Sequence, residues 1–178
     1  MRLLFWHADY IRVEPLKEAL KERDKKIKIE EYNEPLVVLM SIEKGDEKFI
    51  NFAIEEILEV FKKVGAKTIV LYPYAHLSSN LENPKKAREI LNKIYLNLQE
   101  KVGFVKKAPF GWYKLFEIKV KGHPLSELSK TINEEIVKIK DKKEEKKKEE
   151  FLVISEKGEE LSLEEILKLV EEGNIKKN

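Results

Sequence analysis

The feature that most restricts the fold is an alternation of strand-like and helix-like patterns. The run Leu36–Ile42 is continuously apolar, which is typical of a strand covered on both faces. Apolar residues then recur every three or four positions over 46–64, which predicts a helix. A strand over 68–72 and a helix over 83–103 repeat the sequence of elements. Because this order requires crossover connections, it predicts an α/β fold with a largely parallel element.

The ends of both helices carry ordinary start and stop residues. Asn83 can cap free backbone amides, and Pro84 suits the first helical position. Gly65 and Gly103 follow the two apolar stripes and are predicted to end the helices.

The remaining segments are predicted by shorter patterns. Leu3–Trp6 reads as a short N-terminal strand that places His7 at its carboxyl end, whereas residues 15–34 are charge-rich and predict a helical turn or a surface excursion. Pro109 and Gly111 predict a turn between two strands, which adds a β-hairpin. Alternation from Trp112 predicts a half-buried strand, with Trp112, Phe116, Ile118 and Val120 on one face and Tyr113, Glu117, Lys119 and Lys121 on the other.

A charged segment near the C-terminus sets the expected domain boundary. A last helix is predicted from Pro124, with Leu125, Leu128, Ile132, Ile136 and Ile139 on one face. We therefore expect a domain over 1–140, a charged linker or helix extension over 141–150, and a strand–helix appendage over 151–178 that begins a following unit.

Composition narrows the class of protein. Hydrophobic residues make up 42% of the chain, which is enough for a sizeable core, and 35 basic against 33 acidic residues give a net charge of +2, so a nucleic-acid partner is allowed but not indicated. The chain has no cysteine, which excludes disulfides and thiolate zinc sites. It has no apolar run long enough for a signal sequence or a membrane span, so we expect a soluble cytoplasmic protein.

Candidate chemistry centres on the histidines and one lysine. His7, His76 and His123 each follow an apolar strand-like run, and Lys121 lies beside Gly122 and His123, a combination suited to an anionic or carbonyl-bearing ligand. Capping or packing is the more ordinary role for each of these residues. A three-histidine zinc site lacks any supporting local spacing. Ser78 and Ser79 offer a nucleophile near His76 or, as readily, loop and capping residues.

Several common activities lack their motifs. The chain contains no Gly-x-Gly-x-x-Gly, no phosphate loop, no Gly-x-Ser-x-Gly and no His-Glu-x-x-His, so dinucleotide, P-loop, serine hydrolase and zincin chemistry have no support. No metal or other cofactor is expected.

Four motifs in order resemble the N-terminal editing domain of archaeal threonyl-tRNA synthetases, which shares the D-aminoacyl-tRNA deacylase-like fold. They are His7-Ala8-Asp9-Tyr10, Tyr72-Pro73-Tyr74-Ala75-His76-Leu77-Ser78-Ser79, Lys107-Ala108-Pro109-Phe110-Gly111-Trp112-Tyr113 and Lys121-Gly122-His123-Pro124-Leu125. The resemblance spans roughly residues 1–140. Ala8 departs from the family pattern, in which a serine usually occupies that position.

The resemblance implies hydrolysis of serine wrongly esterified to tRNA(Thr), with a positioned water and participation of the terminal ribose 2'-hydroxyl. By motif position, Lys121 would orient substrate and water, with His76 as its companion. Pro73, Tyr74 and Ala75 would line the aminoacyl pocket, Ala108, Phe110, Gly111 and Tyr113 would lie near the adenosine, and Glu134 is a weaker candidate as a polar support. The implied partners are the tRNA(Thr) 3' end, the catalytic and anticodon-binding domains of a synthetase, and a second copy of the chain.

Two other functions remain open. A standalone enzyme of the same fold would remove D-amino acids from tRNA, and a noncatalytic module of this fold would bind RNA or protein without hydrolysis.

Overall fold

The computed structural model describes residues 1–25, 28–149, 153–154 and 160–161. Contacts between residues divide the chain into two units, Met1–Asn133 and Glu134–Asn178. The first unit carries the mixed sheet and its helices. The strand–helix appendage expected over 151–178 lies outside the described residues, apart from the short strands β8 (Val153–Ile154) and β9 (Glu160–Leu161).

A parallel set of strands forms the centre of the first unit. The strand β3 (Pro35–Ser41) pairs in parallel with β4 (Thr68–Pro73), and β4 pairs in parallel with the short edge strand β5 (Val105–Lys107). All of β3 is buried, as its apolar run predicts. The long N-terminal strand β1 (Arg2–Glu18) pairs antiparallel with β3, on the side of β3 opposite β4.

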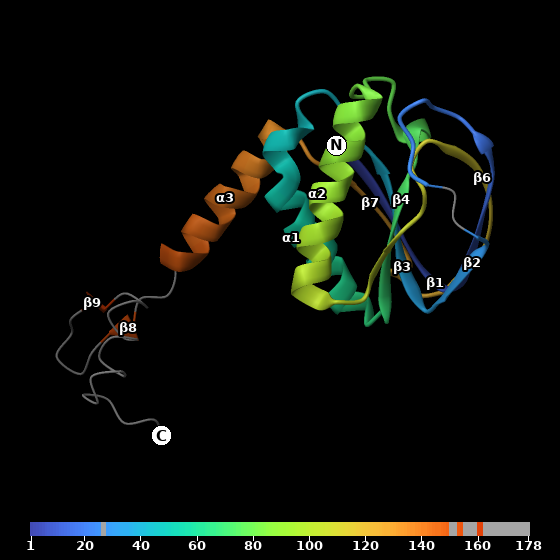
Figure 1. The fold of residues 1–178 in the computed structure, drawn as a ribbon. Helices are drawn as coiled ribbons and strands as arrows, with labels where there is room; N and C mark the ends of the chain where they lie inside the picture. The colour runs from blue at the N-terminus through green and yellow to red at the C-terminus, as the bar shows by residue number, and fades with distance from the viewer. Residues whose placement is uncertain (26–27, 150–152, 155–159, 162–178) are drawn as a thin grey trace. The chain divides into compact units, whose positions relative to one another are not determined.

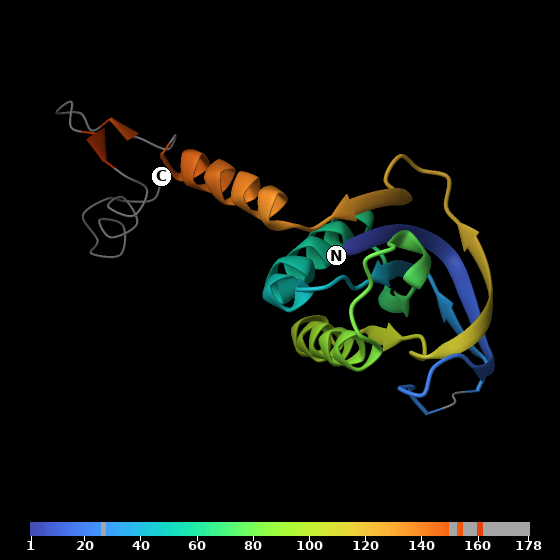
Figure 2. The ribbon, with the colours of Figure 1, turned by 90° about the horizontal axis from the view of Figure 1, so that it is seen from above.

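The strand β1 continues far beyond β3 and carries a second half of the sheet. Its later residues pair with β2 (Glu30–Asn33) on one side and with β6 (Trp112–Val120) on the other, both antiparallel. Its first residues pair with β7 (Glu127–Thr131). Register shifts along the β1–β6 pairing accompany a strong curl of the sheet, which Figure 2 shows from above.

Two helices cover one face of the parallel strands. The helix α1 (Ile50–Val64), preceded by a 3₁₀ turn η1 (Asp46–Phe49), connects β3 to β4, and α2 (Pro84–Val102) connects β4 to β5. Asn83 accepts a hydrogen bond from Lys85 N, as the capping pattern predicts. Figure 1 shows α1 and α2 side by side on one face of the sheet, with β1, β2 and β6 curling around its other face.

The curled strands enclose an apolar interior. Buried residues from three strands and the segment after β5 meet there, namely Ile11, Val13, Val37, Leu39, Val70, Tyr72 and Ala108. Trp6, Tyr74, Leu77, Phe116 and Ile118 pack partly buried against them. The mixed α/β fold with crossover helices is therefore confirmed.

Three local predictions are wrong. The N-terminal strand is not short but extends to Glu18, and 30–33 form β2, because pairing with β1 and β6 supplies the order that a charge-rich pattern does not reveal. The segment after Pro124 is not a helix: residues 127–131 form β7, because the free edge of β1 offers them backbone partners. A helix begins only at Glu134, as α3 (Glu134–Glu149).

The turn at Pro109–Gly111 joins two strands as predicted, but they do not form a hairpin with each other. β5 pairs with β4, whereas β6 pairs with β1. The turn therefore carries the chain from the edge of the parallel strands across to the curled half of the sheet. Among the described residues, no helix is long and apolar enough to cross a membrane.

Candidate functional site

The carboxyl end of β4 leads into a short aromatic segment. Tyr74 is half-buried, and His76 is exposed in the 3₁₀ turn η2 (Ala75–Leu77). The rings form a chain in which Tyr72 and Tyr74 lie 6.2 Å apart and Tyr74 and His76 lie 5.1 Å apart between centroids. The backbone of Tyr74 is held by its N–H, which donates to Met40 O at 2.9 Å, and by its carbonyl, which accepts from the Ser41 hydroxyl.

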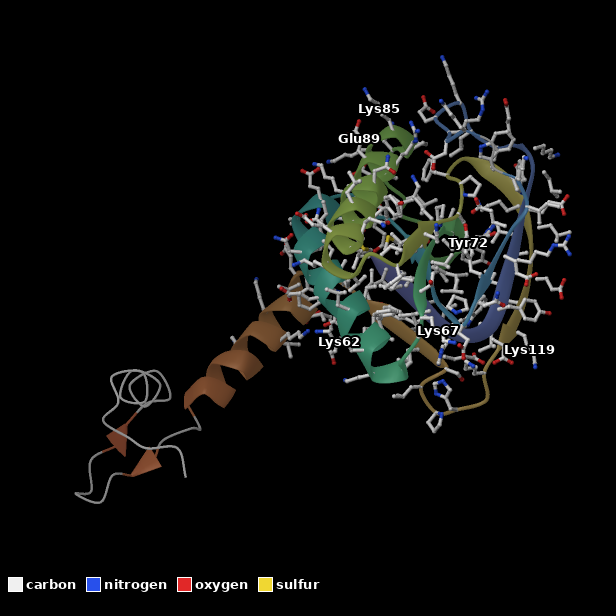
Figure 3. All side chains as sticks on the ribbon, turned by 60° about the horizontal axis from the view of Figure 1, so that its bottom comes forward. Lys62, Lys67, Tyr72, Lys85, Glu89 and Lys119 are labelled. Atoms are coloured by element: carbon white, nitrogen blue, oxygen red, sulfur yellow. The ribbon has the colours of Figure 1, made fainter. Side chains whose placement is uncertain are left out.

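A lysine that the sequence patterns did not single out faces this segment. Lys114 lies near the start of β6, and its Nζ is 5.1 Å from the centroid of the Tyr72 ring. The amine donates to Pro109 O at 3.2 Å and to Trp112 O at 2.9 Å. Burial lowers the pKa of Lys114 to about 8, against an opposing effect of the Asp24 carboxylate. Figure 3 shows Tyr72 in the interior between β4 and the curled strands.

The turn before β6 brings the predicted adenosine-binding residues to the same region, with one exception. Ala108 and Phe110 are buried, and Ala108 N donates to Leu71 O at 2.9 Å, one residue before Tyr72. Tyr113 is 56% exposed and lies on the opposite face of β6 from Lys114, where Lys17 Nζ is 5.2 Å from its ring centroid.

Gly111 allows a neighbouring segment to approach this turn. It has a positive φ of 76°, and a Cβ built on it would lie 2.7 Å from Arg23 Cβ and 2.8 Å from Glu22 O. Its carbonyl accepts hydrogen bonds from Ala19 N and Leu20 N. Only glycine fits this approach without movement of the neighbouring backbone.

Lys121 lies in a different environment from His76. Its Nζ is 2.8 Å from Asp9 Oδ1 and 3.8 Å from Glu34 Oε1, and the hydrogen bond to Asp9 raises the pKa of Lys121 above its usual value. Asp9 has its pKa lowered to about 2 by hydrogen bonds from Lys121 and Lys119. Glu34 directly precedes β3, so this ion-paired cluster lies at the amino end of the parallel strands, whereas His76 follows their carboxyl end.

The structure therefore does not bring Lys121 and His76 together. Lys121 follows the end of β6 and Lys114 lies near its start, so roughly 20 Å of extended strand separates their backbones. Figure 3 shows Lys67 and Lys119, which also pair with Glu34 and Asp9, at one end of the sheet, away from Lys85 at the start of α2.

His7 and His123 form a pair beside that cluster. His7 lies inside β1 rather than at its carboxyl end, and its Nδ1 is 2.8 Å from Nε2 of His123. Because Leu125 N donates to Nδ1 of His123 at 3.2 Å, Nε2 of His123 carries the proton and donates to His7. Burial, then His123 and Lys121, lower the pKa of His7.

The remaining candidates do not join either group. Within the described part of the chain, no cluster of three or more His, Asp or Glu side chains could hold a metal ion, so the three histidines do not meet. The hydroxyl of Ser78 donates to Glu43. Glu134 is the first residue of α3, in the second unit.

The arrangement around Lys114 has the features of a site for ester chemistry. A partly buried amine with a pKa near neutrality can hold an oxyanion or exchange a proton, and aromatic rings beside it suit a nucleoside. The sequence did carry a signal for this lysine. Strand alternation places Lys114 on the apolar face between Trp112 and Phe116, where a cation is unusual.

Comparison with known proteins gives consistent matches. Residues 1–132 match the family described as the archaea-specific editing domain of threonyl-tRNA synthetase. The chain is 46% identical over 159 residues to a threonine–tRNA ligase of Pyrococcus furiosus, covering 84% of this chain and 25% of that protein. It is 48% identical over 134 residues to a threonine–tRNA ligase editing subunit of Saccharolobus solfataricus, covering 74% of this chain and 34% of that protein.

The chain thus spans about a quarter to a third of the length of these relatives. Among solved structures, the c-Myc DNA unwinding element binding protein has a similar fold, with a TM-score of 0.57 and 13% identity, over 75% of this chain and 99% of that one. This likeness concerns the fold alone.

Proposed function

The chain belongs to the archaea-specific editing domain family of threonyl-tRNA synthetase, and from this membership we propose that it hydrolyses L-seryl-tRNA(Thr). Its fold is that of D-aminoacyl-tRNA deacylase-like domains. The observation that carries the proposal is the partly buried Lys114 amine, which lies against Tyr72 in an apolar interior close to the aromatic segment that ends in His76.

Physical chemistry explains the need for such a site. Serine lacks only one methyl group of threonine, and a pocket distinguishes one methyl by about 1–3 kcal/mol, which is too little for accurate translation. A second, smaller site that accepts serine and excludes threonine corrects the error. In this domain Pro73, Tyr74 and Ala75 are proposed to line the aminoacyl pocket.

In the proposed reaction, water attacks the carbonyl carbon of the seryl ester. The carbonyl oxygen becomes an oxyanion, the bond to the ribose 3'-oxygen breaks, and serine and tRNA(Thr) are released. The ribose 2'-hydroxyl, supplied by the substrate, relays the proton from the water to the leaving oxygen. No carboxylate–histidine relay is needed for these steps.

Lys114 is proposed to act as an ammonium that stabilises the oxyanion. Its two hydrogen bonds to the carbonyls of Pro109 and Trp112 favour the charged form and fix its position. His76 is proposed to contact the substrate from the exposed end of the aromatic segment. Ala108, Phe110 and Gly111 support the adenosine side through the turn that they form.

Lys121, implied by motif position, fits a structural role better. Its contacts with Asp9 and Glu34 leave it as an ion-paired cation, and the same carboxylates also bind Lys119 and Lys67. We propose that this cluster stabilises the packing of β1, β3 and β6 against one another, because Asp9 lies in β1, Glu34 precedes β3 and Lys121 follows β6. The partners proposed for the domain are tRNA(Thr), the remaining domains of a synthetase and a second copy of this chain.

The function is tested by measuring deacylation of seryl-tRNA(Thr), threonyl-tRNA(Thr) and a D-aminoacyl-tRNA by the wild-type chain. Rapid loss of L-serine alone is expected. Preferential loss of the D-amino acid would instead identify the chain as a D-aminoacyl-tRNA deacylase, and inertness toward all three esters would leave a noncatalytic binding module.

A further inference from the structure

We propose that Asp24 is a positioning residue that holds the Lys114 amine in place through the turn between β5 and β6. This inference rests on the proposed function for its catalytic consequence. Its structural basis is a set of contacts that join the segment after β1, the turn and the helix α2.

Asp24 binds the turn through both its backbone and its side chain. Its Oδ2 accepts from Phe110 N at 3.1 Å, and its own N–H donates to Phe110 O at 3.0 Å. Its carbonyl accepts from the indole Nε1 of Trp112 at 2.9 Å. These three hydrogen bonds hold the residues on either side of Gly111.

The same turn supplies both acceptors of the Lys114 amine. Pro109 precedes Phe110, and Trp112 carries the indole that binds Asp24. A shift of the turn would therefore move the two carbonyls and with them the ammonium group. Displacement of a catalytic group by about 1 Å can reduce a rate about a hundredfold.

Two cations fix Asp24 from the other side. Arg88 Nε, on α2, lies 2.7 Å from Oδ1, and Lys107 Nζ, at the end of β5, lies 2.9 Å from Oδ2. The side chain of Asp24 is only 15% exposed, so these pairs are poorly screened by solvent. Although burial opposes its ionisation, the hydrogen bonds from Lys107, Phe110 N and Arg88 lower the pKa of Asp24. It is therefore an anion at neutral pH.

Its charge also acts on Lys114 directly. Two groups face the Lys114 amine: the Tyr72 ring from β4 and the Asp24 carboxylate from the segment after β1. Lys107 and Arg88 pair with that carboxylate. Tyr74 and His76 lie further along the aromatic segment. Burial favours the neutral amine, whereas Asp24 favours the ammonium. Asp24 thus contributes both to the position and to the charge of the oxyanion-binding group.

The test variant is Asp24→Asn, which removes the charge and keeps the size of the side chain. Glu89→Gln, an exposed change on α2 beside Arg88, is the control for loss of one negative charge. NMR titration of the ¹³Cε signal of Lys114 is measured together with the pH profile of seryl-tRNA(Thr) deacylation. For Asp24→Asn, the Lys114 midpoint and the falling limb of kcat should both move to lower pH, and kcat should fall about tenfold or more with KM within about twofold.

A folded Asp24→Asn protein whose Lys114 midpoint and kcat match those of Glu89→Gln would overturn the proposal. If Asp24→Asn does not fold, Trp112→Phe decides, because it removes the indole donor to the Asp24 carbonyl and leaves the Asp24 carboxylate in place. We then expect a reduced kcat with an unchanged midpoint of the Lys114 titration. An unchanged kcat would overturn the proposal that Asp24 positions the amine through the turn. If the wild-type chain hydrolyses no ester, the proposed function fails, while the titration still tests the coupling of Asp24 to Lys114.

Discussion

At the scale of single residues, two lysines of one strand region differ because their surroundings differ. Lys114 has two carbonyls and an aromatic ring as neighbours and loses solvent, so its pKa falls to about 8. Lys121 has carboxylates as neighbours, so its ammonium form is stabilised. Motif position suggests Lys121 as the lysine that orients the substrate. In the sequence, only strand alternation marks Lys114 as unusual, because it places a lysine on the apolar face of β6.

The role of Lys114 as an ammonium predicts a pH dependence. The ratio of the enzymatic to the uncatalysed rate of seryl-tRNA(Thr) hydrolysis should be constant below pH 7 and fall as the pH rises through about 8, because the amine then loses its proton. Single-turnover rates between pH 6 and 9.5 measure this ratio. A ratio that rises through the same range would contradict the ammonium role and indicate a general base.

The His7–His123 pair predicts that the fold weakens in mild acid. The pKa of His7 in the folded state lies below the ordinary histidine value of 6.5, so the unfolded state binds more protons. The contribution of His7 to the free energy of unfolding is complete above pH 6.5 and is lost as the pH falls below it. Asp9 and Glu34 face His7 and oppose this shift, but burial, His123 and Lys121 outweigh them.

Urea unfolding at pH 7.5 and pH 5 measures this effect. The wild-type chain should lose stability between the two values, and His7→Gln should lose less. Because the carboxylates with lowered pKa values titrate at more acidic pH, they contribute little in this interval. Equal pH dependence in the two proteins would show that the histidine pair is not responsible.

At the scale of elements, the predictable parts are those whose pattern depends on burial alone. The all-apolar β3 and the amphipathic α1 and α2 were predicted close to their observed bounds. β2, β7 and the second half of β1 were missed, because their order comes from pairing with strands distant in sequence. The proposed site shows the same division: the segment Pro73–His76 follows a predicted strand, whereas Lys114 approaches it only through the curl of β1 and β6.

The turn before β6 should be sensitive to a single methyl group. Gly111→Ala places a Cβ within 3 Å of the backbone of Glu22 and Arg23 at a positive φ. Gly65→Ala is a matched control, since its φ is also positive but nothing lies within 4 Å of the added Cβ. The control should cost about 1–2 kcal/mol of unfolding free energy, and Gly111→Ala about 1–3 kcal/mol more.

Chemical denaturation of both glycine variants separates strain from crowding. The difference between the two costs measures the close approach of the 19–25 segment to the turn. Equal costs would mean that this segment does not pack on Gly111 in solution.

At the scale of the whole molecule, the first unit contains every described element that surrounds Lys114. The family match ends at residue 132, and the contact unit ends at Asn133. The charged segment near the C-terminus predicts a boundary at residue 140. We propose that the editing function resides in the first unit, with Glu134 outside it.

Truncation after Asn133 tests this division. The shortened chain should unfold cooperatively and hydrolyse seryl-tRNA(Thr) within about threefold of the full-length rate, because its buried core lies within Met1–Asn133. Glu134→Gln in the full chain is the companion variant and should behave like the wild type. A folded but inactive truncation, together with an inactive Glu134→Gln, would assign Glu134 to the site.

The most direct test of the whole account compares two lysine substitutions in deacylation of seryl-tRNA(Thr). Lys114→Ala should reduce kcat by about a hundredfold or more, since removal of one oxyanion-stabilising donor costs about that much. Lys121→Ala, measured at neutral pH on protein shown to be folded, should keep kcat within a few fold. The reverse result, an active Lys114→Ala and an inactive folded Lys121→Ala, would contradict the assignment of the chemistry to the Lys114 site.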